Sequence, residues 1–283
     1  MKQRNVGHSG LRISPLGLST AGWTVEKARD ILSEFVSLGG CFVDIAPGTA
    51  HVLAAAIEEI GREKLVLSAP VGVDMSLPVG SRVNCSRTNL LAELDHLLNA
   101  LGTDYVDVLS AGYWDARTPP DEVAGTVQSV VASGRARYGG AHGYAGWQLA
   151  VTPGLVVTHN DYSLLRRDIE EEVIPAAQHL GVGVIAAAPL AHGLLTGNWQ
   201  PNRPETHPYA GEKSRTIVEA LVTAADGLGL SPTATSLAWV FAQPGVDGVV
   251  CEVDSVGHLH ELMKVPEIIL PRPIASALDD VSK

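Results

Sequence analysis

The sequence predicts a single (β/α)8 barrel domain over residues 1–283, and three observations lead to this prediction. Short apolar segments alternate with longer amphipathic segments along the chain, which is typical of parallel βα units. Eight such apolar segments can be counted, enough to close a barrel. The chain also has the length of one barrel, about 250 residues, and no linker or shift in composition divides it.

The expected strands are short segments rich in Val, Ile, Leu and Ala. In chain order they are 16–23, 41–46, 64–72, 105–114, 136–142, 155–162, 182–190 and 247–253. The clearest helical patterns between them cover 24–40, 86–102, 166–181 and 216–229. The first of these helices has Thr24 as its expected N-cap and ends in glycines. Residues 2–14 alternate around a glycine turn, which predicts an N-terminal β-hairpin that plugs the bottom of the barrel.

Composition narrows the expected partners. The net charge is −11, so the chain should repel nucleic acid and anionic lipid. Its three cysteines are too few and too scattered for a disulfide framework, and no signal peptide or membrane-spanning run is visible. We therefore expect a cytoplasmic protein, a monomer or small homo-oligomer, whose partner is a small-molecule substrate or ligand.

Several segments together resemble the aldo-keto reductase superfamily over nearly the whole chain. They are 4–23, 41–46, 103–109, 160–167, 183–199 with an intact Gly-Leu-Leu-Thr-Gly turn, and 236–250. The resemblance implies an N-terminal hairpin followed by the barrel, and carbonyl reduction with NADPH. It also implies that the chemistry lies at the carboxyl ends of the strands, as in other barrels of this class.

The resemblance implies a catalytic set of aspartate, tyrosine, lysine and histidine, of which this sequence keeps the aspartate. Asp44 stands at the aspartate position, but Thr49, Pro70 and Gly112 stand where the other three are expected. No tyrosine occurs between residues 1 and 104, so a shifted alignment does not restore it. Threonine is too weak an acid to protonate an alkoxide, and proline has no donor.

The positions that the resemblance assigns to the cofactor also differ. Those that would hold the nicotinamide are occupied by His142, Gly143, His159 and Ala187. In the loop after the last strand, Glu252 and Asp254 would repel the 2′-phosphate of NADPH. On this basis we expect no cofactor.

The same barrel end offers other chemistry. Asp44, His142 and His159 are the expected catalytic residues, because imidazoles exchange protons near neutral pH and both should project into the space of the nicotinamide. The expected substrate-binding residues are Trp23, Thr49, Tyr113, Trp114, Tyr162 and Glu252. The two histidines with Asp44 or Glu252 could form a metal site, but no local motif supports one, and we expect no metal.

These residues predict a non-redox acid–base enzyme of the dehydratase, lyase, isomerase or cyclase type. Its substrate would be a small oxygenated metabolite in a specialised biosynthetic pathway. One alternative is a catalytically silent ligand-binding or regulatory protein. The second alternative is an NADPH-dependent aldo-keto reductase with an atypical active site.

Overall fold

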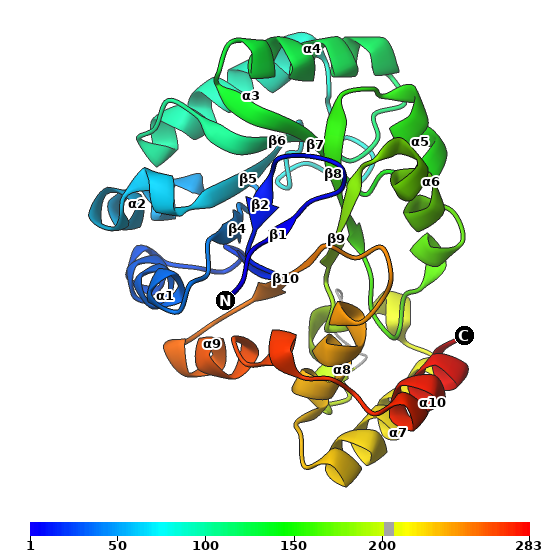
Figure 1. Ribbon diagram of the computed structural model, residues 1–283. Helices are drawn as coiled ribbons and strands as arrows, with labels where there is room; N and C mark the ends of the chain where they lie inside the picture. Colours follow the sequence, from blue (N-terminus) through cyan, green and yellow to red (C-terminus); the bar gives the residue numbers. More distant parts are fainter. Residues whose placement is uncertain (201–206) are drawn as a thin grey trace.

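The computed structural model describes residues 1–200 and 207–283, and a closed barrel of parallel strands forms its centre (Figure 1). The strands follow each other around the barrel in chain order, and β10 pairs with β3 to close it. They are β3 (Leu16–Ser19), β4 (Phe42–Asp44), β5 (Val66–Val71), β6 (Val106–Gly112), β7 (Ala136–His142), β8 (Leu155–Asp161), β9 (Gly183–Ala187) and β10 (Gly248–Glu252). The predicted (β/α)8 barrel is confirmed.

Helices surround the barrel, and their apolar faces pack on the outside of the strands (Figure 1). They are α1 (Val25–Ser37), α2 (Ala54–Ile60), α3 (Arg87–Leu101), α4 (Pro120–Ala132), α5 (Gly146–Val151), α6 (Val173–Leu180), α7 (Glu212–Leu228), α8 (Pro232–Phe241), α9 (Val256–Leu262) and α10 (Arg272–Ser282). Short 3-10 turns are η1 (Ala50–Val52), η2 (Arg62–Lys64), η3 (Asp168–Glu170), η4 (Ala191–Thr196), η5 (His207–Tyr209) and η6 (Val265–Glu267). As predicted, Thr24 caps α1, because its hydroxyl accepts a hydrogen bond from the Lys27 amide.

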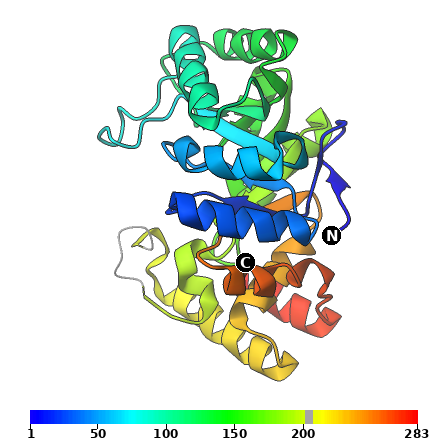
Figure 2. The ribbon, with the colours of Figure 1, turned by 90° about the vertical axis from the view of Figure 1, so that its left-hand side faces the viewer.

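The predicted N-terminal hairpin, β1 (Arg4–Asn5) and β2 (Arg12–Ile13), crosses the opening at the amino ends of the strands (Figure 1). It is held there by apolar contacts of Val6, Leu11 and Ile13 with the lower barrel interior. Figure 2 shows the hairpin on the right and the long loop after β5 on the left, at the opposite end of the barrel. The hairpin therefore closes one end and leaves the carboxyl ends of the strands for the site.

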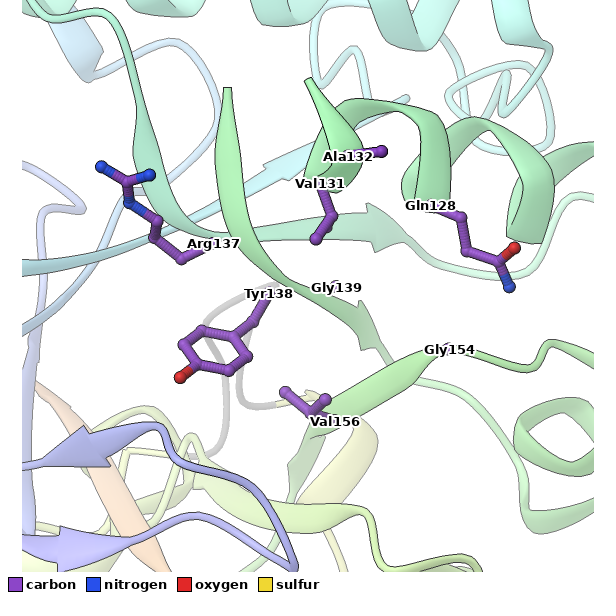
Figure 3. A pocket seen from close by; sticks show the side chains of 8 residues that line it. All are labelled: Gln128, Val131, Ala132, Arg137, Tyr138, Gly139, Gly154 and Val156. Carbon is purple, nitrogen blue, oxygen red and sulfur yellow. The ribbon is translucent and has the colours of Figure 1, made fainter. Parts of the chain in front are cut away.

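A surface hollow of about 260 Å³ lies at the hairpin end of the barrel, not at the carboxyl ends (Figure 3). It is bordered by the last turn of α4 and the first residues of β7 and β8. Its lining residues are Gln128, Val131, Ala132, Arg137, Tyr138, Gly139, Gly154 and Val156. This hollow is remote from every predicted site residue.

None of the helices in the described ranges has the length and apolar character that crossing a bilayer requires.

The hairpin turn leads to a prediction about stability. Gly7 has a φ of +50°, and a Cβ added there would lie 2.4 Å from the Gly181 carbonyl oxygen. Gly22 also has a positive φ, +71°, but a Cβ there would meet nothing within 4 Å. We expect Gly22→Ala to cost about 1–2 kcal/mol from backbone strain alone, and Gly7→Ala to cost about 1–3 kcal/mol more from the clash. Chemical denaturation would measure both; equal losses would contradict this account of hairpin docking.

Candidate functional site

Five neighbouring strands each direct one polar side chain into the upper half of the barrel. These residues, which we name the polar cluster, are Asp44 (β4), Ser68 (β5), Ser110 (β6), His142 (β7) and His159 (β8). Strand register explains the grouping, because Asp44 is paired with Ser68 across β4 and β5, and His142 with His159 across β7 and β8. Paired residues of parallel strands point to the same face of a sheet.

One carboxylate oxygen of Asp44 faces both imidazoles. The distance from Asp44 Oδ1 is 3.5 Å to His142 Nε2 and 3.7 Å to His159 Nε2. The two rings are stacked, with centroids 4.2 Å apart and an interplanar angle of 18°. The structure thus brings together the three residues that the sequence selected as catalytic.

The two imidazoles differ in depth. Its side chain is only 1% exposed, whereas that of His142 is 14% exposed. His159 also stacks on Phe42, a residue of the lower barrel interior. The stack therefore runs down into the barrel, with His142 toward the solvent, and does not extend across the mouth.

The polar cluster is unusual because its buried polar atoms lack partners. Asp44 Oδ1, Ser68 Oγ, Ser110 Oγ, His142 Nε2 and both ring nitrogens of His159 make no hydrogen bond of good geometry with a described residue. The Ser68 hydroxyl still lies close enough to Asp44, and the Ala141 backbone close enough to His159, to affect the pKa of each. Buried polar groups in proteins are nearly always hydrogen-bonded, since an unpaired one costs about 1–3 kcal/mol. So many unpaired atoms at one place indicate a site that binds something polar.

Burial also controls protonation in the polar cluster. It raises the pKa of the Asp44 carboxyl above its ordinary value, although the neighbouring His142 opposes the shift. It lowers the pKa of His142, and that of His159 falls well below its usual range. Burial therefore shifts all three groups toward their uncharged forms.

The residues at the other positions of the implied catalytic set have structural roles. The Thr49 hydroxyl lies 2.5 Å from that of Thr20 and donates to the Ala46 carbonyl oxygen. Pro70 lies near the end of β5. A Cβ at Gly112 would be 2.2 Å from Val73 Cγ2, so a histidine has no room there.

Of the predicted substrate-binding residues, Tyr113 and Glu252 lie exposed at the carboxyl ends of β6 and β10. Tyr113 is 52% exposed and has a φ of +48°, a strained conformation that turns the chain at the rim. Trp23 is buried beside them, and its indole N–H donates to the Val253 carbonyl oxygen at 2.7 Å. These three residues border the mouth.

The other two aromatic residues predicted to bind substrate pack against neighbouring side chains. Tyr162 is 1% exposed, its hydroxyl lies 2.5 Å from Glu170 Oε1, and its ring packs on Trp239 of α8. It belongs to the outer packing between barrel and helices. Trp114 packs edge-on against Tyr144 and Trp147, and it is partly buried in that aromatic group.

Ser68 and Ser110 are the members of the polar cluster that the sequence did not single out. Both are fully buried within largely apolar strands. The signal was a hydroxyl two or three residues before the strand end, at a position whose side chain points inward. Such serines are common in barrel strands, so only the unpaired hydroxyls distinguish them.

The polar cluster could also hold an ion, and the strand ends beside it could hold a cofactor. One ligand atom each from Asp44, His142 and His159 lies within 4.8 Å of the others. Next to β8, β9 ends in Ala187, which offers no aromatic face, and the following strand β10 ends in the exposed carboxylate of Glu252.

Comparison with known proteins identifies the relatives of this chain. The model of the aldo/keto reductase family matches residues 15–283. An uncharacterized oxidoreductase of Bacillus subtilis, YrpG, is 32% identical over 99% of this chain and 96% of its own. L-glyceraldehyde 3-phosphate reductase of Escherichia coli O157:H7 is 31% identical over 80% of this chain and 72% of its own. A probable voltage-gated potassium channel subunit beta of Arabidopsis thaliana is 26% identical over 95% and 92%.

These matches overturn two expectations. The family and the first two names indicate oxidation–reduction, so the prediction of a non-redox lyase or isomerase is wrong. The prediction of a cofactor-independent protein is wrong for the same reason, because reductases of this kind need a hydride donor. Both errors came from treating the substituted positions as a loss of the family's chemistry. With a family match over residues 15–283 and the barrel to support it, the chain belongs to the aldo/keto reductase family.

Proposed function

We propose that this protein reduces the carbonyl group of a small-molecule substrate, with a nicotinamide dinucleotide as the hydride donor. The observation that carries the proposal is the polar cluster: its unpaired donors and acceptors lie at the reactive end of a barrel of the aldo/keto reductase family. The named activity of the Escherichia coli relative supports a small carbonyl compound as the substrate class.

The charged residues near the strand ends indicate which nicotinamide dinucleotide, NADH or NADPH, the protein would bind. When bound, it supplies the hydride that adds to the carbonyl carbon. Glu252 and Asp254 are both exposed, and a carboxylate suits a ribose hydroxyl, whereas a 2′-phosphate is bound by arginine. Glu252 would hold the ribose, and these residues fit NADH better than NADPH.

The polar cluster would receive the carbonyl oxygen. His142 is its more exposed histidine and lies next to the carboxyl of Asp44, whose pKa is raised by burial. As negative charge develops on the substrate oxygen, the Asp44–His142 pair donates its proton there, which leaves an alcohol and is later replaced from water. Donors that are already desolvated and fixed need little reorganisation during this step.

Tyr113 and Trp23 would border the substrate on the β6 and β3 sides of the mouth. A cytoplasmic location goes with the proposal, since the three cysteines are free and buried. We propose a single domain acting as a monomer or small homo-oligomer, without nucleic-acid or membrane partners.

Removing the proton donors should abolish most of the turnover. For the reduction of small aldehydes, we expect Asp44→Asn and His142→Ala each to lower kcat by about 10²–10⁴-fold, the usual range for a lost general acid. The measurement is the oxidation of NADH at 340 nm across a panel of aldehydes. His51→Ala is the matched control, because His51 is exposed in η1 near the mouth and should leave kcat unchanged. Full activity in both cluster variants would refute the assignment.

The negative charges of Glu252 and Asp254, at and after the end of β10, determine whether we expect NADH or NADPH to bind more tightly. We expect the wild-type protein to bind NADH about tenfold more tightly than NADPH, a difference of about 1.4 kcal/mol, because Glu252 and Asp254 would repel a 2′-phosphate. Glu252→Arg should reverse or abolish this preference, and Glu252→Gln should reduce it. Fluorescence titration with each nucleotide measures it directly. A wild-type preference for NADPH would show that the rim carboxylates do not contact this part of the cofactor.

A further inference from the structure

We propose that Asp44, His142 and His159 form a binding site for one divalent transition-metal ion, with Zn²⁺ as the best match. The site consists of two imidazole nitrogens and one carboxylate oxygen, contributed by β7, β8 and β4. Two histidines and a carboxylate are a common ligand set for Zn²⁺ in catalytic sites, with one coordination position left open.

The distances within this set favour a shared cation over direct hydrogen bonds. The separations of 3.5 and 3.7 Å from Asp44 Oδ1 to the two Nε2 atoms exceed the usual hydrogen-bond range. Ligands about 2.0–2.1 Å from a tetrahedral Zn²⁺ lie roughly 3.4 Å apart, which is close to both separations. The two rings are nearly parallel, so one of them must tilt for both lone pairs to converge on the ion.

A second, independent observation is the lack of partners. His159 is almost completely buried, and neither of its ring nitrogens makes a hydrogen bond of good geometry with a described residue, although the Ala141 backbone lies close enough to affect its pKa. His142 Nε2 and Asp44 Oδ1, the atoms that would bind the ion, are also unpaired. Because burial disfavours the imidazolium form, both rings have lone pairs ready to coordinate.

With the ion bound, Asp44 and His142 would be ligands, and the ion would take the place of the proton donor in the proposed function. In the open coordination position it would polarise a substrate carbonyl oxygen as a Lewis acid, and solvent would then supply the proton. This role rests on the proposed reductase function, whereas binding of the ion does not. Ser68 and Ser110 lie beside the ligands as hydroxyls that could orient the carboxylate or a bound water.

The test is isothermal titration of chelator-treated full-length protein with ZnCl₂, with CoCl₂ absorption spectra as a second readout. We expect one equivalent of Zn²⁺ to bind, and tetrahedral Co²⁺ bands in the visible range. Asp44→Asn, His142→Ala and His159→Ala should each weaken binding by more than about 100-fold, because even outer-shell losses cost 10–100-fold. His51→Ala and His96→Ala, which remove exposed histidines, should bind as the wild type does.

Circular dichroism would verify folding, and the partly exposed His142 gives a variant that should fold even if His159→Ala does not. Absence of stoichiometric binding, or unchanged binding in folded His142→Ala, would overturn this inference and leave the reductase proposal intact. Zn²⁺ binding without reduction of any carbonyl would support this inference and refute the reductase proposal. Binding lost equally in His51→Ala would indicate surface histidines instead of this site.

Discussion

Barrel closure is the constraint on which the site depends. Because β10 pairs with β3, none of the barrel strands has a free edge, and alternate side chains of every strand must point into the interior. In the lower half these side chains are apolar and pack against the hairpin. In the upper half, five adjacent strands contribute polar groups. The closed sheet therefore holds a carboxyl, two imidazoles and two hydroxyls close together and largely shielded from solvent.

The sequence was sufficient for the fold and for part of the site. Alternating apolar and amphipathic segments predicted all the barrel strands, and strand register then placed Asp44, His142 and His159 together. It could not show that His159 lies beneath His142, because that depends on side-chain packing across the barrel. Nor could it show that Tyr162 packs on Trp239 and bonds to Glu170. Trp239 is far along the chain, on α8, and the position of Glu170 depends on the conformation of the segment after β8.

The main error concerned function. Reading Thr49, Pro70 and Gly112 as a loss of reductase chemistry assumed that only the implied tyrosine could serve as the proton donor. A desolvated carboxyl beside an imidazole can also hold a proton at neutral pH, and a cation can take over the polarising role. The fold therefore constrains where the reaction occurs more strongly than it constrains which side chain assists it.

The central claim is that the polar cluster serves hydride transfer to a carbonyl. The most direct measurement is a single-turnover incubation of the protein with NADH carrying deuterium at C4 on either face of the ring and a panel of small aldehydes, followed by mass spectrometry. We expect the wild-type protein to form an alcohol with one deuterium on its carbinol carbon from only one of the two labelled forms of NADH. We expect Asp44→Asn to form no such labelled alcohol. Saturable nucleotide binding without deuterium in any product, or equal transfer by Asp44→Asn, would contradict the central claim.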